Sequence, residues 1–262
     1  MAGTYKRYVR LHSPPWLFAV VASVYWLLNP YTDTQLLYPT GNCYRHWNLT
    51  TGEKYHFPDL RHIRKASVDR RDKYDTYTID EFAAVEPGDT VVEIGAYVGE
   101  FTLPASNIAE HVVAFEPAPQ SFESLRLNTA DLANVEVYQR AISDSDGTVS
   151  FNVAPDPSDN SLLAVDSGER TERLQVKSMR LPTAMDAVGV SQIDFLKIDA
   201  EGAEPEVVAG IGDFPVDRIA VDCSAERDAE SPVEEIRATL GRRGFETRLR
   251  TDPRPILCGR RT

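Results

Sequence analysis

The segment 90–116 constrains the fold more than any other part of the chain. Thr90–Ile94 is a short apolar run that ends in glycines, which is typical of a buried parallel strand opening into a tight turn. A second apolar run, 112–115, predicts another buried strand, and the segment 101–109 between the two is predicted to be helical. This strand–helix–strand order predicts the nucleoside-binding half of an α/β fold.

The residues around the turn indicate which nucleoside is bound. Gly95 and Gly99 allow the backbone to approach a ligand closely. Glu116 ends the second strand about 20 residues after the first glycine, a position suited to holding a ribose diol. Glu93 precedes the turn, where a carboxylate repels a pyrophosphate but suits a cation such as the amino group of a methionine moiety. The pattern favours S-adenosylmethionine over NAD, whose folds prefer G-x-G-x-x-G, and an NAD-dependent oxidoreductase is the alternative.

The rest of the chain alternates predicted strands and helices, which indicates a mostly parallel sheet that ends in an antiparallel hairpin. Further strands are expected at 135–139 (ending at Ala141–Ile142), 148–153, 174–178, 193–198, 219–221, 245–250 and 255–259, and helices at 78–85, 121–132 and 233–243. Ligands bind beyond the carboxyl ends of such strands, and Gly95, Glu116, Ala141 and Asp199 all follow strand ends. The acidic segment 155–172 is interpreted as a lid or as a solvated loop.

The chain divides into an N-terminal extension, 1–75, and a catalytic domain, 76–262. In the extension, Trp16–Leu28 is apolar on all sides, yet a helix of this length spans roughly 20 Å, short of a hydrocarbon core of about 30 Å. Three interpretations compete: the segment 5–31 dips into a membrane, the helix packs on the catalytic domain or a second subunit, or it is a signal-peptide core. Residues 31–75 show no clear periodicity and predict an irregular cap.

Charge is distributed unevenly. The net charge is −12, which argues against nonspecific nucleic-acid binding, yet residues 1–75 hold 11 Lys and Arg against 6 Asp and Glu. A basic N-terminal segment favours an anionic partner. Lysine is scarce beside abundant Asp and Glu, which predicts a halophilic protein or simply an acidic cytosolic enzyme.

Cysteine and histidine usage predicts neither disulfides nor a metal site. The three cysteines are odd in number and lack metal-ligand spacing, so they are interpreted as reduced thiols of a cytoplasmic protein. No histidines are paired at ligand spacing. Asp199 and Asp222 are a weak candidate pair for Mg²⁺, because they have no fixed spacing.

Four motifs carry a resemblance to a known family. They are V-E-I-G-A-Y-V-G at 92–99, F-E-P at 115–117, A-I-S-D at 141–144, and L-K-I-D-A-E-G-A-E at 196–204. Together they resemble the FkbM family of S-adenosylmethionine-dependent methyltransferases, whose K-I-D-x-E-G-x-E pattern makes the last motif the most specific. The resemblance covers roughly residues 78–260 and leaves the N-terminal extension unexplained.

The resemblance implies a Rossmann-like, seven-stranded class I methyltransferase fold and methyl transfer to a hydroxyl oxygen, with acceptors that include sugars and polyketide-type hydroxyls. It implies that Glu116 holds the ribose and that Asp199 lies near the methyl-transfer centre. The family usually has Glu where this chain has Asp222, and Cys223 beside it is also atypical. The other residues carried over would surround the methionine moiety (Glu93, Gly95, Ala96, Tyr97 and Gly99) and frame the adenine (Pro117, Ala141 and Ile142).

Alignment of an activated methyl group supplies much of the acceleration in such a reaction, and a general base assists a hydroxyl nucleophile. Asp199 and Glu201 are the candidates; alternatively Asp199 binds the cofactor or caps the next turn, and Glu201 pairs with an arginine. The prediction is a methyltransferase that acts on a sugar, glycan or glycolipid hydroxyl at the cytoplasmic face of a membrane. A noncatalytic, membrane-tethered module of the same fold is a further alternative.

Overall fold

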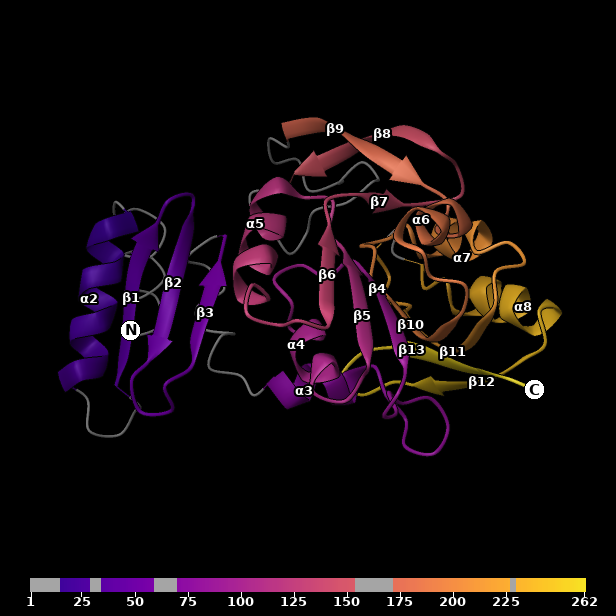
Figure 1. The fold of residues 1–262 in the computed structure, drawn as a ribbon, viewed down its shortest axis with the longest axis horizontal. Coiled ribbons are helices and arrows are strands. Elements are labelled where there is room, and N and C mark those ends of the chain that lie inside the picture. The colour runs from indigo at the N-terminus through magenta and orange to yellow at the C-terminus, as the bar shows by residue number, and fades with distance from the viewer. Residues whose placement is uncertain (1–14, 29–33, 59–69, 154–171, 227–229) are drawn as a thin grey trace.

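A seven-stranded sheet forms the centre of the molecule (Figure 1), as seen in a computed structural model that describes residues 15–28, 34–58, 70–153, 172–226 and 230–262. The strand order is β12-β13-β11-β10-β4-β5-β6, in which β13 runs antiparallel to both of its neighbours. The strands are β4 (Thr90–Ile94), β5 (His111–Phe115), β6 (Val135–Tyr138), β10 (Ile193–Ile198), β11 (Val216–Asp222), β12 (Phe245–Arg250) and β13 (Ile256–Arg261). This confirms the predicted mixed sheet with an antiparallel C-terminal hairpin.

Helices cover both faces of this sheet, which explains why its central strands are mostly apolar on both sides. Val91, Val112 and Phe195 pack toward one helical layer, whereas Val92, Val113 and Leu196 pack toward the other. The first layer holds α3 (Arg70–Thr76), α4 (Thr102–Ser106) and α5 (Pro119–Asn128); the second holds α6 (Leu181–Val188), α7 (Glu204–Gly210) and α8 (Val233–Arg242).

One helical prediction differs from the structure, and two observed helices were not predicted. The helix expected at 78–85 is wrong: the chain turns there, Ile79 bridges to Ala83, and Glu81 has a positive φ of 60°, which a helix excludes. The helix lies just before it, at α3. Helices α6 and α7 have no counterpart among the predicted elements, because each covers only two turns.

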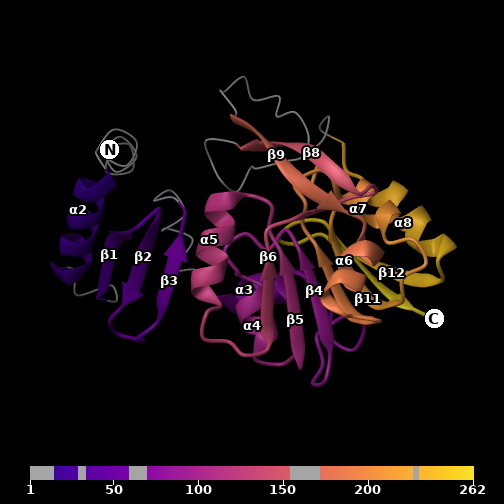
Figure 2. The same ribbon diagram turned by 45° about the horizontal axis from the view of Figure 1, so that its top comes forward.

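A second, three-stranded sheet lies over the carboxyl ends of the main strands in Figure 2. Its order is β7-β9-β8, with β7 at Ala141–Ile142, β8 at Gly147–Val153 and β9 at Glu172–Met179. The strands predicted at 148–153 and 174–178 are present and pair antiparallel, but Ala141–Ile142 leaves the main sheet and pairs with β9 instead of ending the third parallel strand. The predicted lid at 155–172 falls outside the described residues except for Glu172, which begins β9.

The described residues 34–58 of the N-terminal extension form regular strands, so for this part of the chain the prediction of an irregular cap is wrong. The strands β1 (Gln35–Thr40), β2 (Cys43–Asn48) and β3 (Lys54–Phe57) form an antiparallel sheet. Several of its buried positions hold polar side chains (Gln35, His46 and His56), so no simple apolar alternation marks these strands in the sequence. β3 docks beside α5 of the catalytic domain (Figures 1 and 2).

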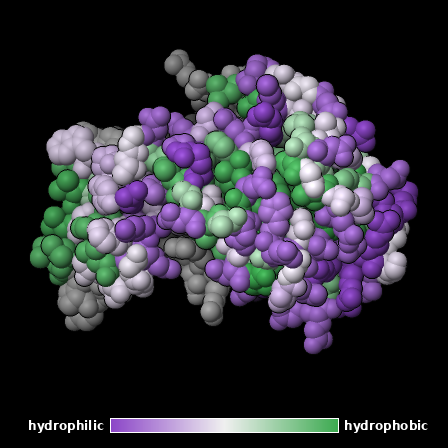
Figure 3. Space-filling model, viewed as in Figure 1, coloured by the Kyte–Doolittle hydropathy of each residue, from purple (hydrophilic) through white to green (hydrophobic). Residues whose placement is uncertain are grey.

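The predicted apolar helix is present as α2 (Pro15–Leu28), which packs on β1. Ala19 and Leu37 are buried between them, and the Ser23 hydroxyl accepts a hydrogen bond of 2.8 Å from the Leu37 backbone N–H. The opposite face of α2 is exposed and apolar, visible as green side chains at the left in Figure 3, with Leu28 74% exposed. Within the described ranges, every helix is too short or too polar to cross a membrane.

Candidate functional site

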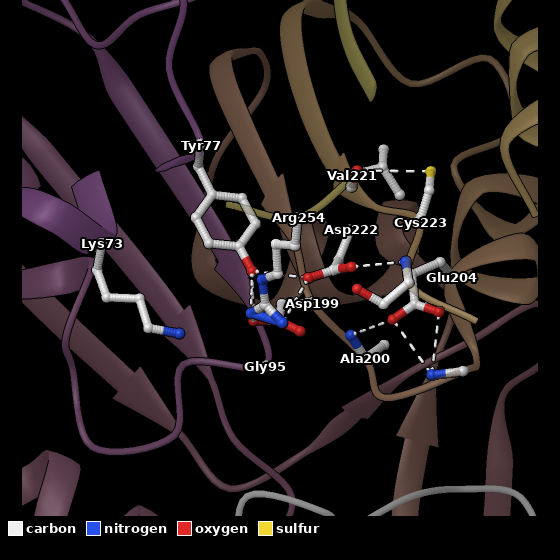
Figure 4. A network of polar contacts seen from close by, with 12 residues as sticks. Lys73, Tyr77, Gly95, Asp199, Ala200, Glu204, Val221, Asp222, Cys223 and Arg254 are labelled. Carbon is white, nitrogen blue, oxygen red and sulfur yellow. Dashed lines mark hydrogen bonds and ion pairs between the residues drawn. The ribbon is translucent and has the colours of Figure 1, made fainter. Parts of the chain in front are cut away.

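Charged side chains line the carboxyl ends of three adjacent parallel strands, and Figure 4 shows two of them, Asp199 and Asp222. Glu93 comes from β4, Lys197 lies on β10, Asp199 directly follows β10, and Asp222 ends β11. Side chains alternate along a strand, and these four point to the face that α3 and α4 cover. The parallel register therefore builds one polar row from residues far apart in the sequence.

Glu93 and Lys197 are register partners and form a buried ion pair. The Lys197 Nζ lies 3.2 Å from the Glu93 Oε1 and donates a hydrogen bond of 2.8 Å to the Gly95 carbonyl. The other Glu93 oxygen accepts a hydrogen bond of 2.5 Å from the Thr102 hydroxyl. Burial raises the pKa of Glu93. Burial opposes the charge on Lys197, but Glu93 and Asp199 outweigh it and raise its pKa.

Three side chains contact one carboxylate oxygen of Asp199: one hydroxyl group and two cations. Its Oδ2 accepts a hydrogen bond of 2.5 Å from the Tyr77 hydroxyl and lies 3.2 Å from Arg254 and 3.6 Å from Lys197. Its Oδ1 is buried and has no hydrogen-bond partner among the described residues. Burial opposes the charge, yet Lys197 and Arg254 hold the pKa of Asp199 well below its usual value.

Arg254 joins the ends of β10 and β11. It lies 2.8 Å from the Asp222 carboxylate, donates to the Tyr77 hydroxyl at 2.9 Å, and pairs with Asp199 as described (Figure 4). The space between the two aspartates, considered above for Mg²⁺, is thus taken by a guanidinium. Elsewhere in the described part of the chain, no three His, Cys, Asp or Glu side chains are grouped to hold a metal ion.

Gly95 begins the glycine loop, which we define as residues 95–99. Its φ is +74°, and a Cβ there would lie 1.7 Å from the Asp199 carbonyl oxygen, so glycine is required where β4 and β10 meet. The backbone N–H groups of Gly95 and Ala96 both donate to the Phe115 carbonyl. The loop is therefore fixed between two strand ends. Its close packing against the protein backbone is enough to explain why position 95 must be glycine, without any contact to a ligand.

Glu116 lies beside this loop at the end of β5. Its carboxylate accepts hydrogen bonds from the backbone N–H groups of Tyr97 at 2.7 Å and Ala118 at 2.8 Å. Burial raises its pKa to about 7, although both backbone donors and Lys197 act in the opposite direction. Each oxygen has a further lone pair for a donor such as a ribose hydroxyl. The carboxylate predicted from the sequence thus stands against the glycine loop, and its role toward ribose stays a prediction.

The three residues predicted to frame adenine converge only partly. Pro117 follows Glu116 and is half-buried, and Ala141 packs with Ala118 in a small apolar cluster. The Ile142 side chain is 2% exposed and belongs to the main core. Ala96 likewise packs inward, against Leu125. Contacts of these four residues with a cofactor stay predictions.

The segment after β10 brings two more carboxyl groups toward Asp199. Glu201 is half-buried with a φ of +49°, and burial raises its pKa to about 10, with Asp199 and Glu226 adding to the effect. The buried Glu204 carboxylate accepts hydrogen bonds from the backbone N–H groups of Ala200 and Gly202, so it fixes this turn. The raised pKa favours the neutral acid form of Glu201.

Three residues at the site have no assigned role in the sequence analysis: Tyr77, Lys197 and Arg254. Lys197 lies within the K-I-D-x-E-G-x-E motif, which is a signal that could have identified it. Tyr77 and Arg254 come from a turn and a hairpin loop that are 177 residues apart, and no sequence pattern connects them.

The donor set fits a cationic, hydroxyl-bearing ligand such as S-adenosylmethionine. Glu116 offers lone pairs for a diol, and Asp199 offers a buried oxygen without a partner. The two cations that contact Asp199 each pair with a second carboxylate, Lys197 with Glu93 and Arg254 with Asp222.

Comparison with known proteins identifies the domain type. Residues 93–247, more than half of the chain, match the methyltransferase FkbM domain. Similar proteins include the 31-O-demethyl-FK506 methyltransferase FkbM of Streptomyces tacrolimicus, 28% identical over 202 residues that cover 64% of this chain and 77% of that protein. Methyltransferase 1 of Beauveria bassiana is 28% identical over 168 residues, which cover 53% of this chain and 66% of that protein.

Solved structures that resemble the chain include a methyltransferase FkbM from Methylobacillus flagellatus, 15% identical with a TM-score of 0.44. The match covers 66% of this chain but only 43% of that chain. Fibrillarin from Aeropyrum pernix with bound S-adenosyl-L-methionine is 14% identical, with a TM-score of 0.48 and coverage of 85% and 96%.

Proposed function

Since the chain belongs to the FkbM family of S-adenosyl-L-methionine-dependent methyltransferases, we propose that it methylates a hydroxyl oxygen of a sugar, glycan or glycolipid. The family relative in S. tacrolimicus is a 31-O-demethyl-FK506 methyltransferase, which supports oxygen as the acceptor atom. The family match favours this function over an NAD-dependent oxidoreductase and over a noncatalytic module. The observation that carries the proposal is the polar row at the strand ends, with the Asp199 oxygen left free for a donor.

We propose that the cofactor lies along the strand ends, with its ribose on Glu116 and its methionine moiety beside Glu93 and the glycine loop. When bound, the cofactor supplies an activated methyl group. The protein's part is to hold the acceptor in line and to take its proton, for which Asp199 is the proposed base. Lys197 and Arg254 keep Asp199 ionised and in place.

The acceptor can be identified by mass. Glycans and lipids of cells that lack this protein are expected to include a species 14 Da lighter than in cells that contain it, one methylene per methyl transferred. Purified protein incubated with the lighter species should release S-adenosylhomocysteine. A mass loss confined to compounds without hydroxyl groups would contradict the proposed acceptor class.

Glu116→Ala is expected to weaken S-adenosylmethionine binding at least about tenfold, because two ribose hydroxyls lose their acceptor. Because the pKa of Glu116 is about 7, the carboxylate is protonated as pH falls, so wild-type affinity should decline below pH 7, while Glu116→Gln should show no such decline. Titration calorimetry from pH 5.5 to 8 measures both. The control is Glu110→Ala, an exposed carboxylate just before β5. Equal binding by wild type and Glu116→Ala would refute the ribose assignment.

We also propose that the enzyme works at the cytoplasmic face of a membrane, with α2 lying in the bilayer surface. The outer side of α2 exposes Trp16, Leu27 and Leu28, at 60%, 62% and 74%. The inner side of α2 packs on β1. The helix could therefore insert into a bilayer only with its axis parallel to the membrane surface. The basic excess of residues 1–75 suits anionic lipid. The halophilic adaptation stays a prediction from composition.

The double variant Leu27→Asn/Leu28→Asn is expected to reduce binding to anionic vesicles at least about tenfold, since both side chains are exposed and the fold does not depend on them. Sedimentation with phosphatidylcholine–phosphatidylglycerol vesicles measures this. Leu249→Asn, an exposed leucine on β12, is the matched control and should bind as wild type. If the wild type does not bind vesicles but forms a dimer, and the double variant is monomeric, then α2 joins subunits and the membrane proposal fails.

A further inference from the structure

The glycine loop is held from outside by two side chains that meet on one carbonyl group. The Val98 carbonyl accepts a hydrogen bond of 2.8 Å from the Asn128 amide, at the end of α5, and one of 3.2 Å from the Tyr55 hydroxyl, on β3. Val98 is fully buried. Tyr55 belongs to the N-terminal extension, which lies outside the matched family domain. The extension therefore contacts the loop to which the proposed cofactor site belongs.

Asn128 also completes the free edge of the small sheet. Its Oδ1 accepts a hydrogen bond of 2.6 Å from the His56 backbone N–H, and its Nδ2 donates one of 3.0 Å to the His56 carbonyl. One side chain thus pairs with β3 as a neighbouring strand would, and the same amide reaches Val98. Tyr55, Phe57 and Val98 pack together as an apolar cluster beneath these bonds. Any shift of β3 is consequently transmitted to the glycine loop.

The loop needs such support because its backbone is strained. Tyr97 has a φ of +52°, a left-handed conformation that is unfavourable for a non-glycine residue. In this conformation its N–H donates to Glu116. Strained residues of this kind persist only where surrounding contacts determine them, and Val98 is the next residue along the chain. Fixing the Val98 carbonyl therefore helps to fix the Tyr97 N–H on the Glu116 carboxylate.

We propose that Tyr55 and Asn128 are positioning residues for the cofactor site, and that the N-terminal sheet is part of the machinery that binds S-adenosylmethionine. They act through Val98 and Tyr97 and do not touch the reacting atoms. The inference rests on the proposed placement of the cofactor at the glycine loop. It predicts that damage to this contact changes cofactor affinity and leaves the chemical step intact.

The variants Tyr55→Phe and Asn128→Asp test this without removing bulk. Tyr55→Phe deletes one hydrogen bond, and the Asn128→Asp carboxylate keeps the bond from His56 N–H but repels the two carbonyl groups. Tyr55→Phe is expected to raise the dissociation constant for S-adenosylmethionine about 3- to 10-fold, as expected for one hydrogen bond, and Asn128→Asp is expected to raise it further, because two donated hydrogen bonds are lost. The KM for S-adenosylmethionine should rise in parallel, with kcat at saturation within about twofold. Tyr38→Phe, which removes a hydroxyl from β1, is the matched control.

Hydrogen exchange gives a readout that does not depend on turnover. Because coupling between sites is reciprocal, S-adenosylmethionine should slow amide exchange in β3 of the wild type, and this protection should disappear in Asn128→Asp. Assays at pH 8 keep His56 neutral, since burial lowers its pKa.

Three results would overturn the inference: wild-type affinity in both variants, a lower kcat with unchanged KM, or reduced melting temperature with unchanged affinity. Failure of the wild type itself to bind S-adenosylmethionine would instead refute the cofactor placement, together with this inference.

Discussion

Lys197→Met is expected to lower the free energy of unfolding by about 3–5 kcal/mol, because it leaves buried carboxylates without their cation. Lys197 is 3% exposed and Glu93 is 1% exposed, so solvent does not screen their interaction. The same ammonium also binds the Gly95 carbonyl and lies near Asp199. Methionine fills a similar volume, so the loss measures charge and hydrogen bonding and not a cavity.

Urea unfolding of wild type and variant measures the difference. Lys177→Met, which removes an exposed lysine from β9, is the control and should change stability by less than about 0.5 kcal/mol. Adding Glu93→Gln to Lys197→Met should recover part of the loss, because it removes one of the uncompensated charges. A loss below about 1 kcal/mol in Lys197→Met would show that Glu93 is protonated in the folded protein and that the pair is not ionic.

Lys197 also illustrates what the sequence could and could not predict. The apolar run 193–198 predicts its strand with the observed bounds, and Glu116 was found because carboxylates at strand ends follow a known spacing. A lysine within such a run can be buried only where another strand supplies an oppositely charged partner, and the sequence pattern of one strand does not identify that partner. Only the register of β4 with β10 sets Lys197 beside Glu93.

The residues that the sequence did not identify depend on tertiary structure in the same way. Tyr77 follows α3 and precedes a turn. The sequence pattern at 78–85 wrongly predicted a helix at this turn. Arg254 lies in the loop between β12 and β13, and it reaches Asp222 only because β13 inserts beside β11. The small sheet of the extension was missed because polar residues (Gln35, His46 and His56) occupy several of its buried positions, so its apolar residues do not alternate.

Asp199→Asn is expected to lower kcat by about 10²–10⁴-fold, the usual contribution of a positioned general base. Asparagine keeps an oxygen for the Tyr77 hydroxyl and Arg254, so the network at this oxygen can persist. Its amide nitrogen then occupies the place of Oδ1, which has no partner among the described residues, and cannot accept a proton. If Asp199 only bound the cofactor, the variant would lose affinity for S-adenosylmethionine and keep its kcat. Single-turnover kinetics and calorimetry separate these outcomes.

The pH dependence of kcat decides between Asp199 and Glu201 as the base. The pKa of Asp199 is held far below neutrality, so a base at this position is ionised throughout and gives a flat profile from pH 6 to 9. The pKa of Glu201 is raised to about 10, so a base there would make kcat rise about tenfold per pH unit over the same range. Glu201→Gln mimics the protonated acid and should retain kcat within about threefold at pH 7. A steep rise with pH that Glu201→Gln abolishes would transfer the role of base from Asp199 to Glu201.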